Sequence, residues 1–301
     1  MRRSLTPLCT LPALLALLSG CGVKSEPTGA QPPLPRRVVD GTGRTVTVTR
    51  PPLRVVSLDP GLTAWLFALG EGDRVVGRSG AETYPKAALS VPVVGTDAQS
   101  AGRIAAARPD LVVAPDTVSV DAARTLSAQV HAPVYVAGPQ TIAGIQHDVL
   151  ALAGLLGSAE RGHQLVGQMR HQLATVRAEV QGDGRVPVFV DRGDRFTIPP
   201  DGIAASEIAA AGGRDAAANA DPNAPYPAAG LARAAPRVYL ASAGTTTLAQ
   251  LRSSAATRHL PAVRAGRFHV VSPQSLTDTG PRVARTVRRL AAILHPGAVQ
   301  G

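Results

Sequence analysis

The stretch Arg108-Pro109-Asp110-Leu111-Val112-Val113-Ala114 sets the pattern of the chain. From Leu111 onward it is a short uninterrupted apolar run, which is typical of a strand buried on both faces of a parallel sheet. The residues on either side predict helices over Ser100–Ala107 and Val120–Val130. A buried strand between two helices is the repeating unit of a mostly parallel α/β sheet.

The same alternation continues in both directions. In the first half, a hairpin is expected around the Gly-rich turn of Val38–Val48, with strands at Arg54–Leu58, Arg74–Gly77 and Val134–Val136 and a helix at Leu62–Leu69. In the second half, strands are expected at Val186–Val190, Val238–Ala241 and Phe268–Val271, with helices at Ala204–Ala211, Ala228–Ala235 and from Pro281 to about Leu294. The sequence therefore predicts two mostly parallel α/β lobes.

A long helical segment separates the two halves. Thr141–Leu156 has apolar residues at helical spacing and ends at Gly157, and a second helix is expected from Ser158 to Val180. At about 1.5 Å per residue, this second helix is long enough to join two lobes. We therefore expect an N-terminal lobe over 38–140, a linking helical segment over 141–184 and a C-terminal lobe over 185–301.

The N-terminus has the features of an export signal. A basic start and a short apolar run precede Leu18-Ser19-Gly20-Cys21, which resembles the bacterial lipobox, so residues 1–20 are predicted to be removed and Cys21 to be lipidated. Residues 21–37 are rich in proline and read as a tether that reaches at most about 55 Å. With Cys9 removed, Cys21 is the remaining cysteine, which excludes a disulfide framework and a cysteine metal site. We expect the protein to be anchored to the outer face of a membrane.

Composition and motifs argue against several functional classes. The formal charge of +10 comes almost entirely from arginines that are scattered among alanines, and no nucleic-acid-binding motif accompanies them, so no nucleic-acid partner is expected. No Walker A loop, dinucleotide fingerprint or His-Glu-x-x-His motif is present, and the seven histidines are dispersed. We therefore expect neither an enzyme nor a resident metal or cofactor.

The order of these elements resembles the iron-siderophore and cobalamin type, or class III, of periplasmic substrate-binding proteins of ABC transporters. The phrases that carry the resemblance run from Val38 to Pro296: Arg54–Pro60, Leu66–Gly70, Gly72–Gly77, Tyr84-Pro85, Val91–Gly95, Arg108–Ala114, Ala235–Leu240, Ala262–Phe268 and Gly280-Pro281-Arg282. The resemblance implies two α/β lobes joined by one long linking helix, with the ligand cleft between the lobes.

Ligands of parallel sheets bind outside the carboxyl ends of the strands. If the lobes face each other as in the family, the ligand-binding residues are expected among the strand ends and nearby loops: Asp59, Arg78, Tyr84, Asp116, Arg192, Arg195, Phe196, Tyr226, Ser242 and Gln274. The stretch Asp191–Phe196 has two interpretations of equal weight, because it is either part of the site or a turn whose charges pair with one another. Arginines at strand ends favour an anionic chelate. The segment 280–296 resembles cobalamin-binding members of the family, but the stretches that match their cleft aromatics carry none here, so both classes of ligand stay open.

The resemblance predicts a monomeric lipoprotein that passes a ferric siderophore, cobalamin, haem or similar metal chelate to an ABC permease. The family docks through a surface glutamate on each lobe, but the matching positions here are Gly102 and Ala229 or Gly230. A permease with altered charges is one alternative, and docking through other acids such as Glu82, Asp97 or Glu207 is a second. Another is a diverged lipoprotein that senses a ligand or interacts with the envelope without transport.

Overall fold

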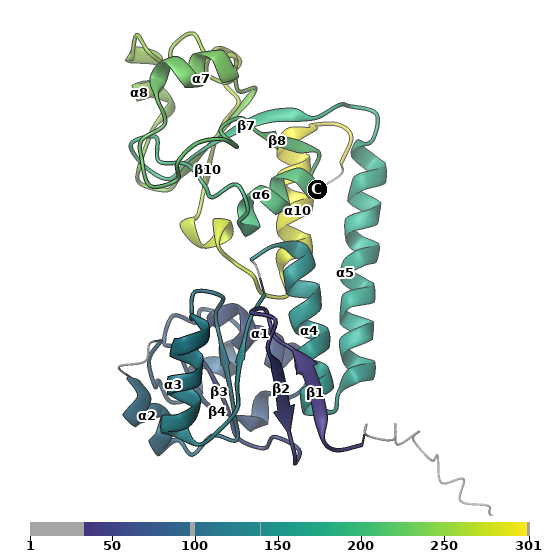
Figure 1. The fold of residues 1–301 in the computed structure, drawn as a ribbon. Helices are drawn as coiled ribbons and strands as arrows, with labels where there is room; N and C mark the ends of the chain where they lie inside the picture. Colours follow the sequence, from purple (N-terminus) through teal and green to yellow (C-terminus); the bar gives the residue numbers. More distant parts are fainter. Residues whose placement is uncertain (1–32, 97–99, 139, 300–301) are drawn as a thin grey trace, which may run out of the picture. The chain divides into compact units, whose positions relative to one another are not determined.

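The computed structural model describes residues 33–96, 100–138 and 140–299 of the 301-residue chain. Residues 31–301 form one unit, whose ribbon is shown in Figure 1. The predicted signal peptide, Cys21 and most of the tether lie outside the described residues, and so does Asp97. Among the described residues, no helix is both long enough and apolar enough to cross a bilayer.

The first lobe is built on a sheet of four parallel strands in the order β4-β3-β5-β6. The strands are β3 (Val55–Ser57), β4 (Val75–Arg78), β5 (Leu111–Ala114) and β6 (Val134–Val136), and the helices between them are α1 (Pro60–Ala68), α2 (Ala101–Ala106) and α3 (Val120–Val130). Every residue of β5 is buried because both faces of the sheet are covered. Val112 packs with the α2 and α3 side, and Val113 packs with the α1 side.

The second lobe repeats this design with the strand order β10-β9-β7-β8, again all parallel. Its strands are β7 (Val186–Asp191), β8 (Gly213–Asp215), β9 (Val238–Ser242) and β10 (Phe268–Val271), and its helices are α6 (Ile203–Ala210), α7 (Ala228–Ala234), α8 (Leu248–Ser253), α9 (Pro261–Arg264) and α10 (Val283–Leu294). Leu240 faces the core shared with α6 and α10, whereas Tyr239 faces the core shared with α7, α8 and α9.

Two consecutive helices connect the lobes, α4 (Ile142–Leu156) and α5 (Ala159–Val180). One apolar stripe of α5 enters both cores: Val166 and Met169 belong to the core of the first lobe, and Val176 and Val180 to that of the second. At about 1.5 Å per residue, the 22 residues of α5 span about 33 Å, and the helix runs alongside both lobes in Figure 1. The predicted fold of two parallel α/β lobes joined by a long linking helix is confirmed.

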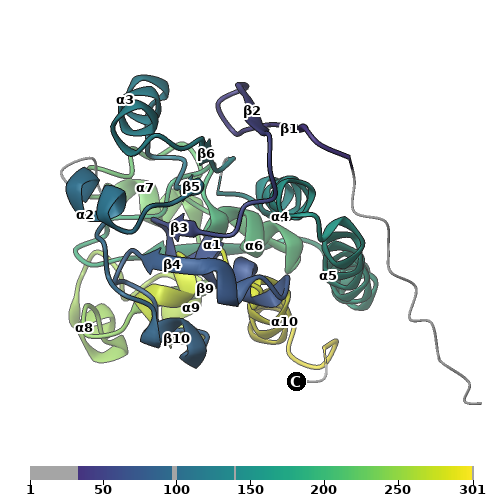
Figure 2. The ribbon, with the colours of Figure 1, turned by 90° about the horizontal axis from the view of Figure 1, so that it is seen from below.

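An antiparallel hairpin, β1 (Arg36–Val39) with β2 (Thr45–Val48), packs beside α4 at the edge of the first lobe (Figure 2). Its turn approaches the end of β6 so closely that a Cβ added at Gly41 would overlap the Ala137 carbonyl, and the Gly41 amide donates to the Val136 carbonyl over 2.8 Å. Strand β8 was not predicted because Gly-Arg-Asp contains no apolar run. The proposed lobe boundaries near residues 140 and 184 stay a prediction, since α5 belongs to both cores.

Candidate ligand-binding cleft

Two hollows adjoin each other where the carboxyl ends of the two sheets meet. The first, of about 320 Å³, is lined by Asp59, Gly61 and Tyr84 of the first lobe and by Asp278, Thr279 and Arg282 of the second. The other, of about 490 Å³, is lined by residues that include Gln140, Arg192 and Ser242. Gln274 and Thr277 line both hollows, so we describe the two together as the cleft. Volumes of a few hundred Å³ match the size of small-molecule sites.

The structure brings six of the ten predicted ligand-binding residues to this region. Asp116 lines a narrow side hollow that shares Asp59 and Thr279 with the first hollow. The six are Asp59, Tyr84, Asp116, Arg192, Ser242 and Gln274. The other four, Arg78, Arg195, Phe196 and Tyr226, line none of these hollows, and their contacts explain where they lie instead. Ligand contact by any of the ten stays a prediction.

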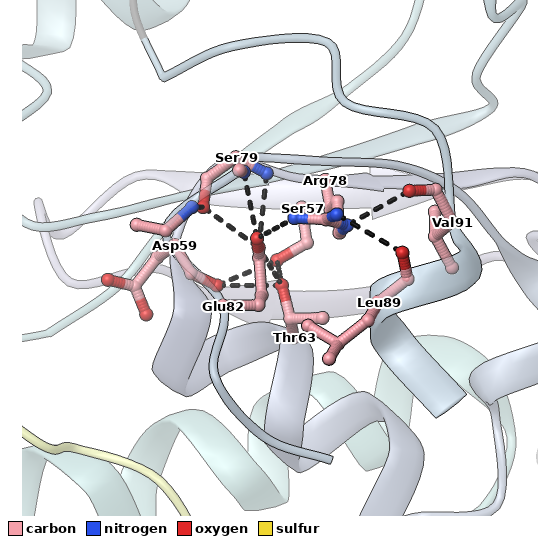
Figure 3. A network of polar contacts seen from close by, with 10 residues as sticks. Ser57, Asp59, Thr63, Arg78, Ser79, Glu82, Leu89 and Val91 are labelled. Atoms are coloured by element: carbon pink, nitrogen blue, oxygen red, sulfur yellow. Dashed lines mark hydrogen bonds and ion pairs between the residues drawn. The ribbon is translucent and has the colours of Figure 1, made fainter. Parts of the chain in front are cut away.

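Arg78 belongs to a buried polar network inside the first lobe (Figure 3). Its guanidinium donates to the Glu82 carboxylate over 2.9 Å and to the backbone carbonyls of Val91 and Leu89. The Glu82 carboxylate also accepts hydrogen bonds from Ser79, Gly80 and Thr63. Burial alone would raise the pKa of Glu82, but these hydrogen bonds outweigh it and lower the pKa. The network therefore fixes the loop that leads to Tyr84, and it leaves the Arg78 charge internal.

Asp191 has the same structural role in the second lobe. Its carboxylate accepts from the backbone amides of Gly193 and Arg195 and from the hydroxyls of Tyr239 and Thr246, at 2.7–3.0 Å. It therefore holds the turn after β7 in place. Asp191 thus belongs to a turn, but amides and hydroxyls rather than neighbouring charges hold its carboxylate. Arg192 of the same stretch lines the cleft.

The remaining three residues pack away from the cleft. The Arg195 guanidinium donates to the Tyr226 carbonyl over 3.1 Å. The Tyr226 ring lies 5.7 Å from that of Phe189 and joins an internal aromatic group. Phe196 closes the turn, since its carbonyl accepts from the Arg192 amide. Tyr84 is an aromatic side chain at the first hollow and is 42% exposed, and Trp65 lines the side hollow.

Asp59 is positioned by the start of α1. It is the N-cap residue, and its carboxylate accepts the Leu62 amide over 2.8 Å. In Figure 3 the carboxylate points away from the Glu82 network. Burial raises the pKa of Asp59, the amides of Leu62 and Gly61 oppose the rise, and the negative charges of Asp116 and Glu82 add to it. Asp59 lines the first hollow and the side hollow, and Asp116 lines the side hollow beside it, so two carboxyl groups lie on the first-lobe side.

An ion pair missed by the sequence reasoning forms the opposite wall. Arg282 donates through two nitrogens to the Asp278 carboxylate, at 2.7 and 3.1 Å, and its guanidinium carbon lies 4.7 Å from the centre of the Tyr84 ring. Tyr84 belongs to the first lobe and Arg282 to the second, so this stacking spans the cleft. The signal was present in the sequence, because Gly280-Pro281-Arg282 carried part of the resemblance.

The lobes also touch directly beneath the cleft. The Trp65 indole nitrogen donates to the Thr279 carbonyl over 2.8 Å, and a Cβ added at Gly61 would overlap the Thr279 hydroxyl. A side chain at position 61 would therefore force the Thr279 side chain to move. On the α6 side, the Ile142 amide donates to the Ser206 hydroxyl over 3.2 Å. These contacts and α5 hold the two walls in one arrangement.

Within the described residues, the positions expected to dock onto a permease do not present exposed carboxylates. Gly102 and Ala229 are exposed but carry no charge, and Gly230 is buried. Glu82 and Glu207 are 5% and 1% exposed. The expectation that Glu82 or Glu207 serves as a docking acid is therefore wrong, because both carboxyl groups are buried. In the part of the chain that the structure describes, no group of three or more His, Cys, Asp or Glu side chains is arranged to hold a metal ion.

Comparison with known proteins agrees with this architecture. The chain is 24% identical to the uncharacterized ABC transporter substrate-binding lipoprotein YvrC of Bacillus subtilis, with 93% of each chain covered, and 26% identical to a cobalamin-binding protein of Halobacterium salinarum, with 85% of this chain and 73% of the relative covered. The structure of the periplasmic haem-binding protein RhuT from Roseiflexus sp. RS-1 superposes with a TM-score of 0.68 at 25% identity, covering 81% and 98% of the two chains. The sequence profile of one family matches residues 55–274, and the chain therefore belongs to the periplasmic binding protein family.

Proposed function

We propose that this protein is the substrate-binding component of an ABC importer and that it captures a metal chelate in the cleft between its lobes. The observation that carries the proposal is the cleft itself, which is lined from both lobes at the carboxyl ends of two parallel sheets. Relatives described as cobalamin-binding and haem-binding support a chelate as the class of ligand. Binding and release, rather than chemistry, would be the activity.

The cleft is suited to a ligand that binds with little movement of the lobes. Helix α5 enters both cores, and closing the lobes by a large angle would break backbone hydrogen bonds of that helix. Both walls also present polar groups without further rearrangement, with Asp59 and Asp116 on one side and Arg192 and Arg282 on the other. A largely preformed site of this kind favours a rigid ligand, and metal chelates are rigid.

The anchor belongs to the same proposal. Acylation of Cys21 would hold the protein at the outer face of the membrane, because each buried CH₂ contributes about 0.8 kcal/mol. The tether of residues 21–37 would then leave the lobes free to turn toward a permease. The relative from Bacillus subtilis that is described as a substrate-binding lipoprotein supports this arrangement.

A second candidate function has one observation in its favour. The positions that the resemblance matches to the family's docking glutamates carry uncharged residues, Gly102 and either Ala229 or Gly230. A lipoprotein that senses a ligand or interacts with other envelope components, without transport, would not need them. Reconstituted permease separates the two candidates, because a transport component binds it and stimulates its ATPase and a pure sensor does neither.

Native mass spectrometry of the protein purified from its own host tests the proposal most simply. We expect a species heavier than the lipidated chain by the mass of one metal chelate. A spectrum of bare protein, together with no binding of haemin, cyanocobalamin or ferric siderophores by calorimetry, would refute the proposal.

A further inference from the structure

A third hollow, of about 400 Å³, opens from the cleft along the start of α10. It adjoins the first hollow of the cleft, because Thr83, Gln274, Asp278 and Arg282 line both. Its remaining lining comes from α10 and from the loop before it. We call it the α10 hollow. A ligand seated in the cleft can therefore extend a substituent into it without crossing a wall of protein.

Three arginines project along one side of the α10 hollow. Arg282, Arg285 and Arg289 are separated by three and four residues, which places them on one face of the helix. The opposite face of α10 is apolar and enters the second-lobe core through Val287 and Leu290. The burial of that apolar face thus fixes the direction in which the arginines point.

The positive charge of this row is only partly balanced. Asp278 pairs with Arg282, but Arg285 and Arg289 have no ion pair or hydrogen bond through their side chains within residues 33–96, 100–138 and 140–299. Ser275 and Thr286 also line the hollow, but their hydroxyls donate to the backbone carbonyls of Ser272 and Arg282. The two uncompensated guanidinium groups are themselves a setting for carboxylate or phosphate oxygens, which guanidinium binds in a fork.

We propose that the α10 hollow receives the peripheral carboxylates of the chelate that lies in the cleft, with Arg285 and Arg289 as their partners. This inference rests on the proposed function and narrows it to chelates with free carboxylates. The stacking of Arg282 on Tyr84 marks the passage between cleft and hollow. A chelate whose periphery bears neutral amides would leave both arginines without an anionic partner.

The test is a calorimetric titration of the lipid-free protein with three probes. Haemin carries two carboxylates, its dimethyl ester carries none, and cyanocobalamin carries peripheral amides. We expect haemin to bind at least tenfold more tightly than either of the others, and its affinity to fall with added salt. The double variant Arg285→Gln/Arg289→Gln should lose roughly tenfold or more in haemin affinity and leave the ester unaffected, as loss of charged hydrogen bonds requires.

Arg288→Gln is the matched control, since it removes one charge from the same helix at a residue that pairs with Glu179 on α5. It should bind haemin as the unaltered protein does, and thermal melts should show that all variants are folded. Equal affinity for haemin and its ester, tighter binding of cyanocobalamin, or no effect of the double variant overturns the inference while the proposed function stands. Failure of all three probes and of ferric siderophores to bind overturns both.

Discussion

Replacement of Glu207 by glutamine should stabilise the protein progressively as the pH rises. Glu207 lies on α6, is 1% exposed, and neither of its carboxyl oxygens has a hydrogen-bond partner in the described part of the chain. Burial, assisted by the negative charge of Asp278, raises the pKa of Glu207 from 4.5 to about 9. The folded protein therefore keeps this carboxyl neutral at physiological pH.

The sign and size of the effect follow from proton linkage. Below pH 4.5 the carboxyl is protonated in both the folded and the unfolded state, so its full contribution to stability is present. Between pH 4.5 and about 9 the unfolded state loses the proton and the folded state retains it, so the free energy of unfolding falls by about 1.4 kcal/mol per pH unit. From pH 5 to pH 8 the free energy of unfolding of the unaltered protein should therefore fall by about 4 kcal/mol through this group. The Glu207→Gln variant has no carboxyl at this position and should not show this fall.

Urea unfolding followed by circular dichroism at pH 5, 6, 7 and 8 measures the effect. The quantity of interest is the stability of the variant minus that of the unaltered protein, because other titrating groups cancel in this difference. A pH-independent part of this stability difference comes from the glutamine amide itself and is not part of the test. Glu160→Gln, at an exposed position on α5, is the control and should give a difference that does not change with pH. If the stability difference between Glu207→Gln and the unaltered protein did not change with pH, the carboxyl would be ionised or hydrated in the folded state. That result would refute the reasoning.

Three further results are expected. Cys21→Ser should move the protein from the membrane to the soluble fraction, and unchanged partition would count against lipidation. Glu82→Gln should destabilise the protein at pH 7 by about 1.5–3 kcal/mol, because it removes the charged hydrogen bond between the Glu82 carboxylate and Arg78. Because the pKa of Glu82 is lowered in the folded protein, this loss of stability should shrink in acid. An equal loss at pH 7 and at pH 3 would contradict this. Small-angle scattering with and without ligand should nearly superimpose, whereas a marked fall in radius would contradict the rigid role of α5.

Much of the fold was accessible from the sequence because central strands are buried on both sides. The continuous apolar runs of β5 and β6 and the turn residues around α3 predicted these elements with the bounds that the structure has. Strand β10 was also predicted over Phe268–Val271, although it is an edge strand without a fully buried residue. Strand β8 could not be found in this way, since it consists of Gly-Arg-Asp at a sheet edge and is held by pairing with β7 rather than by its own pattern. Pairing of this kind depends on tertiary structure, which a local pattern does not contain.

The site was accessible only in part, for a related reason. The rule that ligands bind at the carboxyl ends of parallel strands correctly located Asp59, Arg192 and Gln274 at the cleft. The same rule cannot tell a charge that faces a ligand from one that closes a loop, so Arg78 and Asp191 were indistinguishable from site residues. Arg285 and Arg289 were missed because the sequence does not show which side of α10 borders the cleft. Packing of Val287 and Leu290 in the second-lobe core sets that orientation.

The central claim is that a chelate binds between the two lobes, and Trp65 can report it directly. Trp65 is the single tryptophan of the chain, lines the side hollow of the cleft and donates to Thr279 of the opposite lobe. Titration of its fluorescence with haemin, cyanocobalamin and ferric siderophores should give a saturable change at one chelate per protein. Gln274→Phe, which places bulk where the hollows adjoin, should abolish it. Saturable binding that Gln274→Phe leaves unchanged, or no saturable change with any chelate, would contradict the account.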